Sequence, residues 1–360
     1  MKILHIISSF ETGGAQRLLS DLLPLLAKKE DISILIFNDA NNGFQKKITD
    51  NHITLYNIKK KNFYNPFIIL QLIPILRKYE IVHVHLFPCL YWVAIASIFS
   101  KTHLVYTEHS TNNKRRNKKY FKWLEKWIYG FYEKIISISE QTQDNLKIWL
   151  NATPNDKRFV VIENGIDIET FTNFKNTSQY DSKMPKGKRI LMISRFTQSK
   201  DQETLIRAMM YTAEDIHLLL AGEGETQEKC INLTKQLHLE NRVHFLGTQT
   251  NIPLLISLCD IGVQSSNWEG FGLTAVEIMA GHKPVIASDV NGLKQVVNGA
   301  GILFPPKNEK ALAERINALL QDKTLYNEIS EKCYERACKY DIHKMTEKYM
   351  AIYEEILKNQ

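Results

Sequence analysis

Short apolar runs alternate with longer segments of helical hydrophobic spacing along most of the chain. Residues 15–28, for example, carry leucines at helical intervals, which predicts an amphipathic helix. Strands joined by such helices are typical of a parallel α/β sheet. In the first half, the apolar runs predict strands at residues 2–8, 31–37, 53–57, 81–86, 104–107, 134–138 and 159–162.

The second half of the chain repeats this pattern. Its apolar runs predict strands at residues 189–193, 217–221, 243–246, 261–264, 284–288 and 301–304. The intervening helices are expected to begin near Asp201, Thr226, Asn251, Leu273, Gly292 and Asn308. Two similar doubly wound halves in tandem are therefore predicted.

The length of the chain and one polar segment predict the domain organisation. A chain of 360 residues is longer than one compact core usually serves, so two domains are expected. Residues 171–188 are poor in apolar residues, which is typical of a linker between domains. This places an N-terminal Rossmann-like domain at residues 1–170, a linker at 171–188 and a second Rossmann-like domain at 189–339.

The cysteines and the apolar stretches restrict the class of protein. Five cysteines, an odd number, are spread along the chain without a Cys-x-x-Cys pair, which argues against a disulfide framework and a zinc site. The first residues are predicted as a buried strand and lack the features of a signal peptide. Apolar stretches are too short or too interrupted to span a bilayer, so a folded cytoplasmic protein is expected.

The net charge of +7 is concentrated in the first half of the chain. Residues 1–175 contain 24 Lys and Arg against 16 Asp and Glu, whereas the remainder contains 22 against 23. Cations are densest between Lys114 and Trp127, where aromatic residues are interleaved with them. Such a segment could contact an anionic membrane surface, or it could be a solvated helix face whose aromatics pack inward. The chain has no recognised nucleic-acid-binding motif, so no nucleic-acid partner is expected.

Candidate binding residues follow the predicted strands of both halves. Ligands of such sheets bind beyond the carboxyl ends of the strands, which in two facing domains means the cleft between them. Gly13 and Gly14 follow the first strand and begin a helix, so their backbone could approach a diphosphate, or form only a tight turn. Arg195 and Lys200 follow the first strand of the second half, where two cations could neutralise a diphosphate or be ordinary surface residues.

The most specific motif lies between Glu269 and Glu277. Gly270 and Gly272 lie in a loop that joins a predicted strand to an apolar helix, so backbone N–H groups are available at the positive helix end. Carboxylates in this loop and helix are suited to accept hydrogen bonds from vicinal hydroxyl groups. The alternative interpretation is a capped helix with an unrelated acidic residue in its loop.

In this order, the motifs resemble those of the family four retaining glycosyltransferases. The resemblance spans nearly the whole chain and rests on Gly13 and Gly14, residues 164–167, Arg195 and Lys200, and Glu269 and Glu277 with Gly270, Phe271 and Gly272 between them. It implies a GT-B fold, in which two tandem Rossmann-like doubly wound α/β domains face each other across a cleft. It also implies that residues 340–360 form a C-terminal helix that returns to the first domain.

The resemblance assigns roles to individual residues. Glu277 would hold the ribose hydroxyls of a nucleotide, and Glu269 the hydroxyls of the donor sugar. Arg195 and Lys200 would bind the diphosphate, while His109 matches the histidine that the family places near the donor sugar. Backbone groups would contact the sugar, the phosphates and the base at Gly222, Leu246, Gly270, Phe271, Gly272, Leu273 and Thr274.

The histidines leave structural interpretations open. His109 departs from the family pattern, because Ser110 follows it where an acidic residue is common, and Glu108 precedes it. His83 and His85 share a face of one predicted strand and are interpreted as packing or cleft-lining residues, since a metal would need a third ligand. The chain has no Asp-x-Asp motif, so diphosphate binding without a metal is predicted.

The predicted activity is transfer of a hexose or N-acetylhexosamine from a nucleotide-diphosphate sugar, with a UDP-sugar preferred, to a glycan or lipid-linked sugar acceptor. By resemblance, the anomeric configuration is retained, and preorganised cations and amides stabilise the leaving group. The basic first domain favours an acceptor of surface polysaccharide biosynthesis. Three alternatives remain open: a glycosidase with two carboxylates, a sugar-nucleotide epimerase of the same architecture, and a non-catalytic nucleotide-binding or membrane-surface module.

Overall fold

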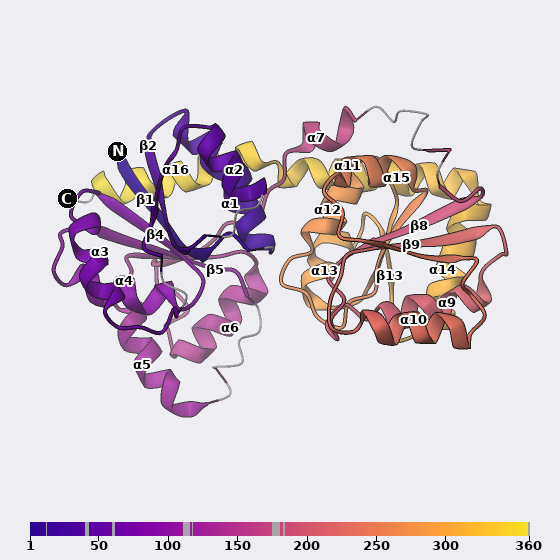
Figure 1. Cartoon of the computed structure of the whole chain (residues 1–360), viewed down its shortest axis with the longest axis horizontal. Helices are drawn as coiled ribbons and strands as arrows, with labels where there is room; N and C mark the ends of the chain where they lie inside the picture. Colours follow the sequence, from indigo (N-terminus) through magenta and orange to yellow (C-terminus); the bar gives the residue numbers. More distant parts are fainter. Residues whose placement is uncertain are drawn as a thin grey trace. The chain divides into compact units, whose positions relative to one another are not determined.

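The computed structural model describes residues 1–11, 13–39, 43–59, 62–110, 116, 118–174, 181–182 and 184–358, and it divides the chain into two compact units. Unit 1 comprises residues 1–165 and 342–360, and unit 2 comprises residues 166–341. Each unit contains one parallel sheet with helices on both faces (Figure 1). The predicted pair of doubly wound α/β units is therefore confirmed.

Unit 1 contains a seven-stranded sheet in the order β3-β2-β1-β4-β5-β6-β7. Each strand begins and ends within one residue of its predicted bounds, because a parallel sheet that is buried on both faces needs nearly continuous apolar strands. The elements of this unit are β1 (Lys2–Ser9), α1 (Gly14–Ala27), β2 (Asp31–Asn38), α2 (Gly43–Asp50), β3 (Thr54–Asn57), α3 (Ile68–Leu76), β4 (Ile81–His85), α4 (Cys89–Ser97), β5 (His103–Glu108), α5 (Lys119–Tyr129), β6 (Lys134–Ser137), α6 (Glu140–Leu150), β7 (Phe159–Val161) and α16 (Ile342–Lys358).

Two separate apolar cores form on the two faces of this sheet. Side chains along β1 point alternately to opposite faces, so Ile3 and Ile7 pack with α1, α2 and α16. Leu4 and Ile6 pack with α3, α4, α5 and α6 on the other face. Helix α16 contacts α1, so the end of the chain completes the first of these cores.

The structure divides the chain a few residues before the segment that was predicted as a linker. The division falls after Gly165, and helix α7 (Ile168–Thr172) already belongs to unit 2. There Phe171 is buried, and Ile166 pairs with Asp341 as a parallel bridge. Residues 175–180 and 183 of the predicted linker lie outside the described residues.

Unit 2 contains a six-stranded sheet in the order β10-β9-β8-β11-β12-β13, and its strands also lie within one residue of their predicted bounds. Helices α9, α10 and α14 pack on one face, whereas α11, α12 and α13 contact the strands from the other. Besides α7, its elements are β8 (Lys188–Ile193), α9 (Gln202–Ala208), η2 (Met209–Tyr211), β9 (Ile216–Ala221), α10 (Gln227–Gln236), β10 (Val243–Gly247), α11 (Ile252–Leu258), β11 (Ile261–Gln264), α12 (Leu273–Ala280), β12 (Val285–Ser288), α13 (Asn291–Val297), β13 (Ile302–Phe304), α14 (Glu309–Gln321), α15 (Lys323–Ala337) and η3 (Cys338–Tyr340).

Each sheet has one point at which the strand order reverses. In unit 1 this point lies between β1 and β4, and in unit 2 it lies between β8 and β11. Such a reversal leaves an opening at the carboxyl ends of the two strands, where ligands of open α/β sheets bind. The loops that follow β8 and β11, together with helix α12, carry most of the residues that the sequence predicted as a site.

Candidate functional site

Two loops of unit 2 are held together at the point of strand reversal. They are the β8–α9 loop, residues 194–201, and the β11–α12 loop, residues 265–272. The backbone N–H of Asn267 donates to the carbonyl of Ser199 at 2.8 Å, and its side-chain amide donates to the carbonyl of Gln198 at 2.9 Å. The Ser265 hydroxyl donates to the carbonyl of Asp201 at 2.8 Å. These bonds fix the two loops as one rigid surface.

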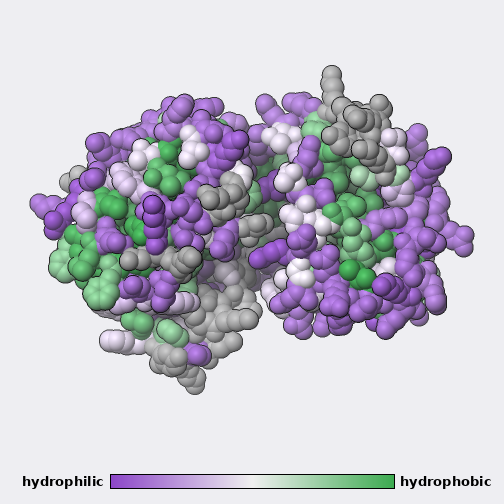
Figure 2. Space-filling view, in the orientation of Figure 1, coloured by the Kyte–Doolittle hydropathy of each residue, from purple (hydrophilic) through white to green (hydrophobic). Residues whose placement is uncertain are grey.

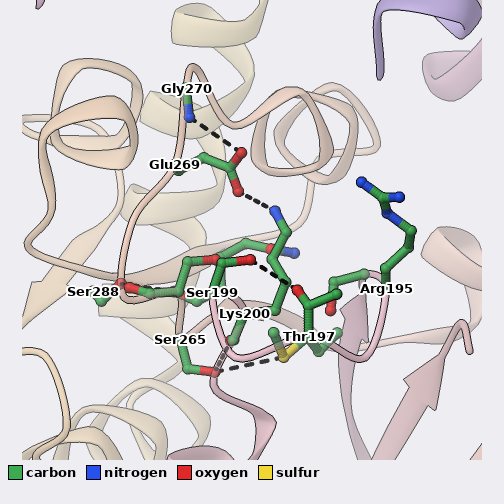
Figure 3. A network of polar contacts seen from close by, with 12 residues as sticks. Arg195, Thr197, Ser199, Lys200, Ser265, Glu269, Gly270 and Ser288 are labelled. Carbon is green, nitrogen blue, oxygen red and sulfur yellow. Dashed lines mark hydrogen bonds and ion pairs between the residues drawn. The ribbon is translucent and has the colours of Figure 1, made fainter. Parts of the chain in front are cut away.

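Lys200 and Glu269 form an ion pair across these two loops (Figure 3). The Glu269 carboxylate also accepts a hydrogen bond from the N–H of Gly270 at 3.3 Å. Both side chains are only partly exposed, and partial burial strengthens the attraction between opposite charges. The long lysine side chain is therefore held in one place before any ligand arrives.

Arg195 lies on the β8–α9 loop with an exposed side chain. Its backbone is fixed, because its carbonyl accepts a hydrogen bond from the Gln202 amide at 3.0 Å and the next residue, Phe196, is buried. In Figure 3 the side chain extends to the same side of the loop as Lys200. Its guanidinium forms no hydrogen bond or ion pair with any described residue, so it remains available to an anion.

Backbone geometry explains the glycines of the β11–α12 loop. Gly272 has a φ of 94° and precedes α12, a conformation that L side chains rarely adopt. A Cβ at Gly292 would lie 2.3 Å from the carbonyl oxygen of Glu269, so only glycine allows α13 to approach this loop. Phe271 is buried and its ring packs against that of Tyr340, and Leu273 and Thr274 begin the helix. The first turn of α12 thus presents backbone N–H groups beside Glu269.

Glu277 lies in the second turn of α12 and is 2% exposed. Glutamates are almost never this deeply buried unless they have partners, because a charge away from water is costly. The helix that begins at the Glu269 loop therefore also carries a buried carboxylate. The structure places both predicted glutamates on one strand–loop–helix segment.

Gly222 follows β9, and Leu246 lies near the end of the neighbouring strand β10. Gly222, at the end of β9, has a φ of 132°, and a Cβ there would lie 2.1 Å from the carbonyl oxygen of Ser194. Its N–H donates to the carbonyl of Gly247 at 2.8 Å. Gly222 thus lies against the β8–α9 loop, whereas Leu246 lies on β10, which β9 separates from β8.

The remaining predicted site residues belong to unit 1. Gly13 and Gly14 follow β1, and the extended φ of −175° at Gly13 can be adopted by any residue. His109 follows β5, and its Nε2 lies 3.1 Å from Nδ1 of His85. Burial lowers the pKa of His109 to about 4, so the imidazole is neutral at pH 7.

The structure adds one histidine to the pair that the sequence singled out. His5 on β1 lies in register with His83 on β4, and the ring nitrogens of His5, His83 and His85 come within 4.8 Å of one another. The sequence carried a signal for this cluster, namely polar residues at alternate positions of otherwise apolar strands. Both nitrogens of His83 contact hydroxyl groups, of Tyr353 at 2.6 Å and Thr107 at 2.7 Å, so hydrogen bonds account for its burial.

Comparisons with known proteins agree with this geometry. The family model for glycosyl transferases group 1 matches residues 174–336, and the model for Glycosyltransferase Family 4 matches residues 12–170. Together these two matches cover most of both units.

Two similar proteins come from Campylobacter jejuni. N-acetylgalactosamine-N,N'-diacetylbacillosaminyl-diphospho-undecaprenol 4-alpha-N-acetylgalactosaminyltransferase is 27% identical over 94% of this chain and 96% of its own length. GalNAc-alpha-(1->4)-GalNAc-alpha-(1->3)-diNAcBac-PP-undecaprenol alpha-1,4-N-acetyl-D-galactosaminyltransferase is 23% identical over 99% of both chains.

A solved structure shows the same fold. The crystal structure of Anabaena Alr3699/HepE in complex with UDP and glucose matches with a TM-score of 0.87 and 23% identity, over 99% of this chain and 100% of that one. The predicted GT-B fold is thereby confirmed. The chain therefore belongs to the group 1, family 4 glycosyltransferases, and it is a glycosyltransferase.

Proposed function

We propose that this enzyme transfers a hexose or N-acetylhexosamine from a nucleotide-diphosphate sugar, preferably a UDP-sugar, to a glycan or lipid-linked sugar acceptor with retention of anomeric configuration. The observation that carries the proposal is the contact between Lys200 and Glu269. In a nucleotide-sugar, the anomeric carbon and the β-phosphorus share one oxygen atom. A group that binds the sugar and a group that binds the diphosphate must therefore be neighbours, as these two side chains are.

The other residues of unit 2 extend this donor site. We assign the diphosphate to Arg195 and Lys200, and the ribose hydroxyls to the buried carboxylate of Glu277. Backbone N–H groups of the β11–α12 loop would contact the sugar and phosphates, because a helix N-terminus attracts anions. Gly222 and Leu246 would contact the base, in keeping with their position at neighbouring strand ends.

The proposed chemistry depends on charge at the leaving group. Negative charge grows on the diphosphate as the bond to the sugar breaks, and fixed cations stabilise this charge more than they stabilise the intact donor. The ion pair with Glu269 keeps Lys200 in position, so little reorganisation is needed at that moment. By resemblance to the family, the acceptor hydroxyl would attack on the face that the diphosphate leaves, without a protein nucleophile.

The names of the relatives support a lipid-linked acceptor. Both Campylobacter proteins are named for transfer to sugars on undecaprenol diphosphate. The excess of cations in residues 1–175 suits such an anionic substrate. We therefore propose a place in surface polysaccharide biosynthesis, at the cytoplasmic face of the membrane.

A donor screen tests the proposed activity. We expect calorimetric binding and slow hydrolysis for one class of uridine- or guanosine-diphosphate sugar, with faster turnover when the glycan acceptor is added. In this proposal Arg195 and Lys200 take the place of a divalent ion, so EDTA should change the rate less than twofold. If EDTA abolished activity and added Mg²⁺ restored it, diphosphate binding without a metal would be contradicted. Conversion of the donor without an acceptor would indicate an epimerase, and hydrolysis of a glycoside would indicate a glycosidase. Donor binding without turnover would indicate a non-catalytic module.

Unit 1 carries a surface that fits an anionic membrane. Helix α5 is anchored on its inner side by Glu125, which is buried and accepts hydrogen bonds from Tyr91 at 2.9 Å and Trp149 at 2.6 Å. This orientation leaves Trp123 and Trp127 79% and 48% exposed. These two tryptophans do not pack inward, which favours membrane contact over the alternative of a solvated helix face.

Neighbouring helices extend this surface. In Figure 2 hydrophobic side chains gather where Figure 1 places α3 and α4. The exposed apolar residues around α3, α4 and α6 are Tyr64, Phe67, Leu70, Ile98, Phe99 and Ile148. Lys118 and Lys126 supply cations, whereas Lys114, Arg115 and Asn117 lie outside the described residues. Of the helices in the described ranges, none is long and apolar enough to cross a membrane, so we propose peripheral contact.

Vesicle flotation measures this contact. We expect the protein to float with vesicles that contain anionic lipid and to float several-fold less with neutral vesicles, since each cation near an anionic surface contributes about 1 kcal/mol. Replacing Lys118 and Lys126 with glutamine, or Trp123 with serine, should reduce flotation. The double substitution of Lys28 and Lys29, at the end of α1 on the other face of the sheet, is the matched control. If flotation does not depend on lipid charge and does not change with these substitutions, the proposed membrane-binding surface is excluded.

A further inference from the structure

A set of polar side chains in unit 1 connects the last helix to His109. It lies on the face of the sheet that α1 and α16 cover, in a core that is otherwise apolar. We call this set the histidine chain, and its members, in order of contact, are Tyr349, Thr107, His83, Tyr353, His5, His85 and His109. All except the last are buried.

Each neighbouring pair in the histidine chain lies within hydrogen-bond distance. The Tyr349 hydroxyl is 3.4 Å from Oγ1 of Thr107, and this oxygen is 2.7 Å from Nε2 of His83. On the other side of the ring, Nδ1 of His83 is 2.6 Å from the Tyr353 hydroxyl. That hydroxyl is 3.5 Å from Nε2 of His5.

The last part of the histidine chain consists of imidazoles alone. Nδ1 of His5 is 3.1 Å from Nε2 of His85, and Nδ1 of His85 is 3.1 Å from Nε2 of His109. Burial lowers the pKa of all four histidines, to about 3 for His5 and well below the usual value for His83 and His85. Each ring is therefore neutral, with one nitrogen that donates and one that accepts.

The buried end of the histidine chain fixes the direction of every hydrogen bond in it. The Tyr349 hydroxyl has Thr107 as its single hydrogen-bond partner among the described residues, so its proton must point there. The opposite direction would leave this buried O–H without an acceptor, which is unfavourable. Thr107 then donates to Nε2 of His83, and every following group donates to the next.

In this direction, all four histidines carry their proton on Nδ1. His109 accepts a bond from His85 at Nε2, and its Nδ1–H has no partner among the described residues. We propose that the histidine chain holds His109 as the Nδ1–H tautomer, which makes it a hydrogen-bond donor and not a proton acceptor at the carboxyl edge of the sheet. His85, His5 and Tyr353 are then positioning residues for His109.

This inference rests on the proposed function for the identity of the group that His109 meets. An N–H donor suits an oxygen of the donor sugar or its phosphates, and a reaction without a protein nucleophile needs no base at this position. The direction of the hydrogen bonds in the histidine chain also bears on metal binding. The imidazole nitrogens of His5, His83 and His85 lie within 4.8 Å of one another. In this direction each Nε2 lone pair already accepts a hydrogen bond, from Tyr353, Thr107 and His5 respectively, so none is left for a metal ion.

Nitrogen NMR of the full-length, histidine-labelled protein tests the proposal. Long-range proton–nitrogen spectra distinguish a protonated Nδ1 from a protonated Nε2, and they need neither donor nor acceptor. We expect the Nδ1–H form for all four members, each assigned by single substitution. The exposed His52 and His238 serve as internal controls and should show the Nε2–H form that free histidine favours in water. A protonated Nε2 on His109, or a metal ion bound stoichiometrically by the cluster, would overturn the inference even in an active enzyme.

Substitution of His85 separates positioning from simple packing. His85→Leu removes the donor to Nε2 of His109, so His109 should shift towards Nε2–H and kcat should fall about five- to tenfold, the value of one hydrogen bond. His85→Asn places an amide nitrogen near the original Nδ1, so it should restore both the Nδ1–H form of His109 and the wild-type kcat. Tyr349→Phe should leave the four tautomers unchanged, because Thr107 then begins the chain. An unchanged His109 spectrum in His85→Leu would contradict the proposal, whether or not the protein transfers sugar.

Discussion

Lys200→Ala is expected to lower kcat about 10²- to 10³-fold while raising KM for the donor much less. The ammonium group would stabilise charge that appears on the diphosphate only as the sugar departs, so its loss affects the transition state more than the bound donor. Steady-state kinetics with saturating acceptor measures both constants. Lys200→Arg should recover part of kcat, since the charge remains but the guanidinium is larger and differently shaped.

A second lysine of unit 2 provides the matched control for this prediction. Lys229 lies on α10 and forms an ion pair with Glu203 at 2.8 Å. It therefore resembles Lys200 in having a carboxylate partner, but it is not a predicted site residue. Lys229→Ala should keep full activity. Wild-type kcat in Lys200→Ala, or an equal loss in both variants, would remove Lys200 from the proposed mechanism. Thermal melting shows whether the variants remain folded.

Glu277→Ala is expected to weaken donor binding about 10- to 100-fold, because a charged acceptor contributes about 1.5–3 kcal/mol per hydrogen bond. Glu277→Gln keeps the volume of this 2% exposed side chain and removes only the charge, so it separates binding from packing. Calorimetry with the nucleoside diphosphate and with the nucleotide-sugar measures the effect. Both ligands should be affected alike, since the proposed contact is to the ribose that they share.

Glu203→Gln is the control for this substitution, because Glu203 pairs with Lys229 of α10 and is not one of the predicted donor-binding residues. It should leave donor affinity within twofold of wild type. If Glu277→Gln bound donor as tightly as the wild type, Glu277 would be a structural residue, and the ribose contact would have to be sought elsewhere in unit 2.

Most of the fold could be predicted from the chain itself. Strands that are buried on both faces must be apolar throughout, so their bounds were visible in the sequence and agree with the structure to one residue. The division after Gly165 was less visible. Polar composition pointed to residues 171–188, whereas the boundary depends on contacts of Ile166 and Phe171 that composition does not encode.

The candidate site divides in a similar way. Motif spacing placed Arg195, Lys200 and Glu269 in loops that follow strands and Glu277 in the next helix, and their roles remain predictions. Only the structure paired Lys200 with Glu269, which are distant in the chain. Only the structure added His5, Tyr349 and Tyr353 to the surroundings of His109, because their contacts depend on which strands and helices are neighbours.

The sequence by itself determined the class of fold, the order of the strands along the chain and the chemical type of the site residues. These properties depend on hydrophobic periodicity and on local turn chemistry, which act over a few residues. The tertiary structure alone decided the strand order within each sheet, the ion pair of Lys200 and the direction of the histidine chain. Those features arise where distant segments meet at the reversal points of the sheets, and buried polar groups there must find partners across elements that local pattern does not connect.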